Sequence, residues 1–176
     1  MGTAFGQVID YLFAGTVTVS VSPLFGQTLK TQLQAVAPNV VLTDNLYIPG
    51  GLVDSDFTVM IGRQSLTSAA SSVNQVRLVL GQFKVDEDFT VPILILCRSM
   101  GPDQKTVRDK GLGLFDAVAH WVHQDLTLNS VLLGGRSAVI TDYTITQTET
   151  DEDQGRGVMQ TAMIAINLQA KNHYLP

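Results

Sequence analysis

The sequence predicts an α+β domain with a mostly antiparallel sheet of two hairpins plus short strands, packed against one long helix and N-terminal helices. Apolar residues recur at three- and four-residue steps between residues 103 and 128, which is the spacing of one buried helix face. Residues 76–98 and 139–168 each hold two strand-like runs on either side of a polar turn, as β-hairpins do. These observations place one helix between two hairpins.

The length of 176 residues fits a single domain, 1–176, in which residues 1–39 form an N-terminal helical region and 40–171 the α+β core. Residues 3–14 carry one apolar helical stripe, and so do residues 24–36, where Pro38 ends the helix. The short alternating run between them, residues 16–21, predicts a strand.

Short strands are predicted at 40–47 and 57–62, and the small, polar residues 65–72 predict a loop. The first hairpin is predicted to run out along 76–85, turn at Asp86-Glu87-Asp88 and return along 89–98. The return strand is apolar on both faces, which predicts a central strand covered by helices. Pro92 has no N–H and is expected at a bulge or on an unpaired side.

The main helix is predicted from Asp103, as its cap, to about Leu128. Its apolar stripe consists of Val107, Gly111, Leu114, Phe115, Val118, Val122 and Leu126. In the last hairpin, alternation at Val139, Thr141, Tyr143 and Ile145 marks the outgoing strand. One face of the returning strand is formed by Val158, Gln160, Ala162, Ile164, Ile166 and Leu168.

The surface is poor in charge for a domain of this size. Only 15% of the residues are charged, and the polar residues are instead 17 Thr, 13 Gln and 10 Ser. An average soluble domain has about 25% charged residues, so the composition favours a surface that meets partner protein. The net charge of −5 and the lack of a basic stripe argue against nucleic-acid binding by phosphate neutralisation.

No segment has the length and apolarity of a membrane span, and the first Lys or Arg is Lys30, so a secretory signal with a basic start is not expected. Cys97, the single cysteine, lies in an apolar run and is expected to be a small buried hydrophobe. An unbridged chain fits the reducing cytosol.

Few residues offer chemistry. His120 and His123 lie three apart on the predicted helix, but zinc needs three or four ligands and only Asp116 and Asp125 are near. A histidine pair packed around Trp121 at a helix surface or a subunit contact is the better interpretation, and no metal or cofactor is predicted. Gly111-Leu112-Gly113 lies inside a helix and lacks the third glycine of a dinucleotide fingerprint, so small residues for close packing on the sheet are expected there.

The order of elements resembles the tail-terminator (tail-completion) family of long-tailed bacteriophages. The residues that carry this resemblance are Asp56 to Gly62, the helix end His123 to Leu128 with the following Val131 to Gly135, and the final Ala165 to Ala170. The resemblance covers about 40–171 and departs from the family in the Thr/Val stretch after Gly15.

The resemblance implies a non-enzymatic virion protein, assembled in the host cytoplasm, that forms a homohexameric ring on the phage tail. Such a ring caps the tail tube protein, ends tube polymerisation and joins the head–tail connector protein, while DNA only passes through its lumen. Another neck or head–tail connector protein is the alternative within this class. A small-molecule-binding α+β enzyme is the alternative from a different class.

The acidic tip of the last hairpin is the candidate site. It consists of Glu149, Asp151, Glu152 and Asp153, followed by Arg156. Like charges at this density repel one another and predict an extended loop. The tip is either a solvated turn without a role, a lining that keeps DNA from sticking to the lumen, or a contact for a basic patch on the tube or connector.

Overall fold

A computed structural model of the chain describes residues 8, 12, 29–43, 56–63, 72–77, 85–100, 103–124, 126, 137–151 and 158–174. The elements in chain order are α2 (Leu29–Val36), β1 (Val41–Thr43), β2 (Phe57–Ile61), β3 (Ser72–Arg77), β4 (Val85–Met100), α3 (Gln104–Gln124), β5 (Ala138–Asp151) and β6 (Val158–Tyr174). The predicted α+β class is confirmed, with a mixed, mostly antiparallel sheet.

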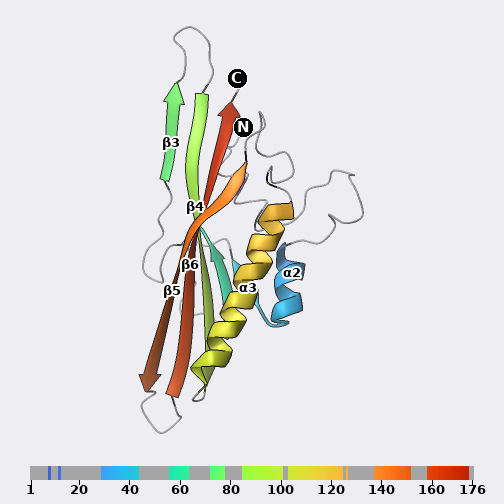
Figure 1. The fold of residues 1–176 in the computed structure, drawn as a ribbon, viewed down its shortest axis with the longest axis vertical. Coiled ribbons are helices and arrows are strands. Elements are labelled where there is room, and N and C mark those ends of the chain that lie inside the picture. The colour runs from blue at the N-terminus through green and yellow to red at the C-terminus, as the bar shows by residue number, and fades with distance from the viewer. Residues whose placement is uncertain are drawn as a thin grey trace.

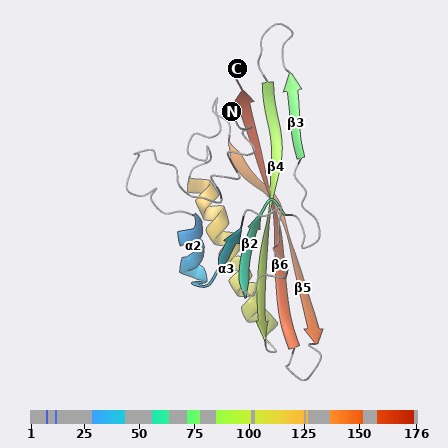
Figure 2. The ribbon, with the colours of Figure 1, turned by 180° about the vertical axis from the view of Figure 1, so that it is seen from behind.

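The sheet has the strand order β1-β2-β4-β6-β5, and β4 and β6 form its long centre (Figure 1). On the side away from β6, β4 has two partners in succession. β3 pairs with the first part of β4, from Arg77↔Val85 to Ser72↔Thr90, and β2 pairs with a later part, Ile93 to Cys97. β1 runs parallel to β2, whereas every other pairing is antiparallel. The strands twist so strongly that they cross in projection (Figures 1 and 2).

The helix α3 lies on one face of the sheet, and α2 packs beside it (Figure 1). The core between helices and sheet is continuous and consists of alternate residues of the strands. Its fully buried members include Leu114, Val118 and Val122 from α3, Ile93 and Ile95 from β4, and Ile164, Ile166 and Leu168 from β6. The predicted inner faces of the main helix and of β6 are therefore confirmed, except that Leu126 is 42% exposed.

The prediction that β4 is a central strand is confirmed, since it pairs with β6 on one side and with β2 and β3 on the other. Among the described residues, both helices lie on one face of the sheet. On the other face Met60, Leu94 and Leu96 are each 2% exposed, and Met163 and Ala165 pack against them. The double-sided apolar run of β4 thus reflects two separate apolar clusters, one on each face.

Asp86, Glu87 and Asp88 do not form a turn, in contrast to the sequence prediction. They belong to β4, paired with β3 on one side and β6 on the other. Asp and Glu are uncommon in strands, but pairing on both sides overrides that weak preference. The predicted strand 76–85 is replaced by β3, which includes Ser72 from the predicted loop, and residues 78–84 lie outside the described part.

Pro92 lies within β4 at the point where neither β3 nor β2 pairs with it, since β3 pairing ends at Thr90 and β2 pairing starts at Ile93. The Pro92 carbonyl accepts a hydrogen bond from the Gly62 N–H at 2.7 Å, so this side of Pro92 faces β2. A strand residue directs its N and its C=O to the same side. The Pro92 nitrogen therefore faces the side on which no strand pairs with Pro92, and its missing N–H costs no ladder hydrogen bond. The predicted unpaired side is confirmed.

The N-terminal predictions are only partly within the described residues. Val8 and Leu12 are helical and completely buried, which agrees with the predicted helix 3–14, and α2 lies within the predicted helix 24–36. β1 covers the start of the predicted strand 40–47. The predicted strand 16–21 lies outside the described residues. Within the part that is described, neither helix is long and apolar enough to cross a membrane.

Candidate protein-binding surface

The strand β5 forms one edge of the sheet, and its only strand partner in the described part of the chain is β6. All residues from Thr141 to Thr150 are exposed. The sequence Thr-Asp-Tyr-Thr-Ile-Thr-Gln-Thr-Glu-Thr favours an extended strand because threonine, tyrosine and isoleucine have high β-propensity. It contains no Lys or Pro, which natural edge strands often use to avoid pairing with other chains, and its only charged residues are Asp142 and Glu149.

A β-bulge near the start of β5 determines which side chains face α3. The register passes from Ile140↔Leu168 to Asp142↔Asn167, so Thr141 is an extra residue. In a regular strand without a bulge, Thr141 would pair with Asn167 and Asp142 would take the position opposite Ile166 that Tyr143 occupies. The sequence pattern predicted Val139 and Tyr143 on the same face of the strand, and this was wrong. Ala138 and Ile140 face the core, whereas Val139 is 45% exposed.

After the bulge, two apolar side chains of β5 lie on the α3 face and remain open to solvent. Tyr143 is 50% exposed and Ile145 36% exposed. The Tyr143 ring contacts Phe115 of α3, with ring centroids 4.6 Å apart and an interplanar angle of 39°. The opposite face of β5 carries Thr144 and further threonines at every second position. The edge therefore presents an apolar side and a threonine side.

Glu149 belongs to β5 rather than to a loop, and the strand continues to Asp151. The Glu149 Oε2 atom accepts hydrogen bonds from Gln160 Nε2 at 2.9 Å and from Gln104 Nε2 at 3.4 Å. Gln160 is only 2% exposed, and its Oε1 atom has no hydrogen-bond partner. Glu149 thus serves to satisfy a buried amide, and the prediction that it lies in an extended loop was wrong.

The remaining residues of the acidic tip are not brought together by the described structure. Asp151 is placed as the last residue of β5, while Glu152, Asp153 and Arg156 lie outside the described residues. The structure therefore assigns Glu149 to the hairpin body and leaves the role of the other four as a prediction.

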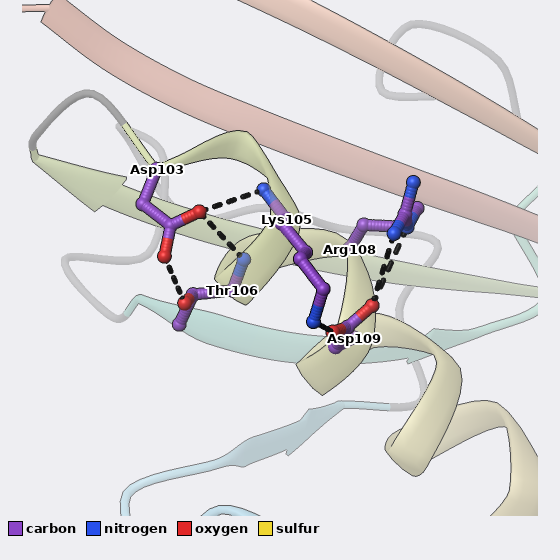
Figure 3. Close-up of polar contacts among 5 residues, drawn as sticks. All are labelled: Asp103, Lys105, Thr106, Arg108 and Asp109. Carbon is purple, nitrogen blue, oxygen red and sulfur yellow. Dashed lines mark hydrogen bonds and ion pairs between the residues drawn. The ribbon is translucent and has the colours of Figure 1, made fainter.

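The start of α3 is held by a capping residue, as the sequence predicted. Asp103 Oδ1 accepts hydrogen bonds from the backbone N–H groups of Lys105 (3.1 Å) and Thr106 (3.2 Å), and the Thr106 hydroxyl donates to Oδ2 (Figure 3). These hydrogen bonds lower the pKa of Asp103, with the Thr106 hydroxyl as the largest cause. Lys105 also pairs with Asp109, which lowers the pKa of Asp109. These contacts stabilise a helix end and hold no ligand.

The histidines lie on the exposed side of α3, beside the buried Trp121. His120 Nε2 is 2.8 Å from Gln124 Nε2, and Gln124 Oε1 accepts a hydrogen bond from Gln32 of α2 at 3.3 Å. Among the described residues no three His, Cys, Asp or Glu side chains gather as metal ligands would. Gln124 thus joins α3 to α2, and His120 contacts Gln124 within α3.

The Cys97 side chain is completely buried in the core under α3. Burial raises the pKa of its thiol to about 12, and the charge of Lys110 offsets only part of this effect. A reactive thiolate needs a lowered pKa and access to solvent, and this thiol has neither. Cys97 therefore acts as a small core residue, as the sequence predicted.

No protein-family model matches the chain, and no curated protein is similar enough in sequence to match it.

Proposed function

We propose that the chain is a structural virion protein that forms a homohexameric ring on the end of a phage tail tube. In this role the ring ends tube polymerisation and provides the joint to the head–tail connector. DNA passes through the lumen, and the chain performs no chemical reaction. The virion is its site of action, after assembly in the host cytoplasm.

The observation that carries the proposal is the exposed edge of β5. A chain that works alone usually protects an edge of this length with Lys, Pro or a covering segment. Here ten consecutive exposed residues, 141–150, contain no Lys or Pro and have only the bulge at Thr141 and the carboxylates of Asp142 and Glu149 to limit pairing, and two apolar side chains lie open on one side of them. Such an edge supports a function in which other protein chains cover it. The order α2, β3–β4, α3 and β5–β6 also supports the family resemblance.

The stability of an assembly formed through this edge depends on the area that the subunits bury between them. A stable protein–protein contact buries about 1,600 Å² in total, and a ring with heterologous contacts forms two such interfaces per subunit. Low charge helps here, since desolvating threonine and glutamine costs less than desolvating Lys or Glu. The composition and the edge therefore support the same kind of role.

Negative-stain electron microscopy of the purified protein, alone and with isolated tail tubes, tests the proposal. We expect rings with a central hole, either free or at one end of each tube, and native mass spectrometry should give six subunits. Monomers in both conditions, with bare tube ends, would contradict the proposal. Rings that bind only a connector protein would assign the chain to the neck instead.

The acidic tip gives a second test, designed around the position of Glu149. Because Glu149 accepts a hydrogen bond from buried Gln160, the variant should change only Asp151→Asn, Glu152→Gln and Asp153→Asn. The matched control is Asp116→Asn, an exposed carboxylate of α3. If the tip lines the lumen or contacts a basic partner, the triple variant impairs DNA ejection or head joining and the control does not. Normal phage from both variants would show a solvated turn without a role.

A further inference from the structure

The outer side of β5 lacks a strand partner within the described residues, so its backbone donors and acceptors are available to another strand. The chemistry of that edge selects among possible partners. From Asp142 to Thr150 the only charged residues are Asp142 and Glu149, and both are acidic. A second copy of this edge can therefore pair with it only if the carboxylates of Asp142 and Glu149 do not lie opposite one another.

The alternation of side chains keeps them apart. After the bulge, the odd-numbered residues 143 to 149 lie on the α3 face and the even-numbered residues 142 to 150 on the opposite face. In an antiparallel pair, residues directly opposite one another lie on the same face. A two-fold axis perpendicular to the sheet keeps the two α3 faces on the same side. Because Asp142 and Glu149 lie on different faces, Asp142 of one copy cannot lie opposite Glu149 of the other.

An axis at Ile145 illustrates the fit. Ile145 then lies opposite its own copy, Tyr143 opposite Gln147, Thr144 opposite Thr146 and Asp142 opposite Thr148. Cross-strand threonine pairs and apolar pairs each contribute roughly 0.2–1 kcal/mol. The two exposed apolar side chains, Tyr143 at 50% and Ile145 at 36%, come together with their copies on one face.

We propose that the β5 edge pairs antiparallel with the β5 edge of a second copy about a two-fold axis near Ile145, which joins the two sheets into one. This inference goes beyond the proposed function and does not depend on it. Two copies related by such an axis point in opposite directions, so they cannot present the same end to one tube. The dimer is therefore a state of the free protein.

Cysteine cross-linking tests the pairing directly. Residues opposite one another in an antiparallel pair have Cβ atoms about 4.5–5.5 Å apart, so a cysteine near the axis forms a disulfide or reacts with a short bis-maleimide. Ile145→Cys lies opposite its own copy and tests for a disulfide. Thr146→Cys, on the other face, lies diagonal to its copy at about 7–8 Å and tests for a link through the bis-maleimide. Val139→Cys, an exposed residue before the bulge, is the control. The native Cys97 is buried and does not react with the cross-linking reagent. We expect covalent dimers from the first two variants and none from the control.

A charge at the axis gives an independent measurement. Ile145→Lys places two like charges close together and should raise the dimer dissociation constant at least about tenfold, since like charges opposite one another are destabilising. Val139→Lys, an equally apolar exposed position on the same strand, should leave that constant unchanged. Sedimentation equilibrium measures both, and thermal unfolding verifies that both fold. Thr146→Lys replaces Ile145→Lys if the latter does not fold.

The outcomes separate this inference from the proposed function. A wild-type protein that is monomeric at every concentration, or a dimer that neither Lys variant weakens, overturns the β5 pairing. Free protein that gives no β5–β5 cross-link at any concentration but still forms rings on tubes overturns the pairing and leaves the proposed function in place. If the free protein gives β5–β5 cross-links but the protein that is not cross-linked never caps a tube, the pairing is supported and the proposed function is refuted.

Discussion

Gly111 of α3 lies close to the sheet, and a substitution there measures how tightly the two layers pack. A Cβ atom at Gly111 would lie 3.3 Å from Ile164 Cδ1 and 3.6 Å from Cys97 Sγ. Gly111→Ala gains about 1 kcal/mol of helix propensity. The displacement of Ile164 costs about 0.5–1.5 kcal/mol if it leaves its rotamer. We therefore expect an almost unchanged free energy of unfolding for this variant.

Gly111→Val is the decisive change, because it adds two further methyl groups between helix and sheet. Overpacking of a core costs about 1–3 kcal/mol. The control is Gly113→Val, which has the same propensity change but meets Val36 Cγ1 at 3.1 Å, and Val36 is 38% exposed and can turn toward solvent. We expect Gly111→Val to be less stable than Gly113→Val by about 2 kcal/mol. Urea unfolding of both variants measures the difference, and equal stabilities would refute the close packing at Gly111.

Three further predictions concern the helix cap, the cysteine and the buried amide. Asp103→Ala should lower the thermal midpoint at neutral pH. Because the folded pKa of Asp103 is lowered below its ordinary value of 3.8, its stabilisation is present above pH 3.8 and should disappear as the pH falls below it, so the two midpoints converge in acid. Cys97 should react with a thiol reagent at pH 8 only after unfolding, and rapid reaction of the native protein would show that the thiol is accessible. Gln160→Met removes an unpaired buried oxygen and should leave stability unchanged or raise it by about 1 kcal/mol; a clear loss of stability would mean that its bond to Glu149 outweighs the unpaired atom.

The class of the fold and the long central elements could be predicted from the sequence because their patterns are long and regular. The helix α3 has an apolar stripe over most of its length and a capping residue at its start, and β6 alternates without interruption. The turn predicted at Asp86-Glu87-Asp88 was wrong because local preference is weak compared with pairing on both sides of β4. Strand pairing is a tertiary property, and it is absent from a local window of sequence.

The candidate surface could be predicted only in part, since its character depends on a single bulge. Thr141 shifts the phase of β5 by one residue, and this decides that Tyr143 and Ile145 face α3 while Val139 does not. A bulge of this kind leaves no clear signal in the sequence, because threonine fits a regular strand equally well. The role of Glu149 escaped sequence reasoning for a similar reason: its partner Gln160 becomes neighbouring only through the β5–β6 register.

The long exposed edge of β5 also sets a condition on the free protein. An unprotected strand of high β-propensity and low charge pairs with whatever strand it meets, and aggregation is the result when pairing is not limited. A closed contact limits it, because a two-fold pair uses up both edges and a ring leaves none open. We therefore expect the free chain to aggregate or assemble unless another strand covers β5. Introducing Lys at both Thr144 and Thr146, which are exposed on the side away from α3, should yield a soluble monomer that no longer assembles. Light scattering at increasing protein concentration measures this, and a double variant that assembles like the wild type would show that the β5 edge is not the surface on which the chain meets its partners.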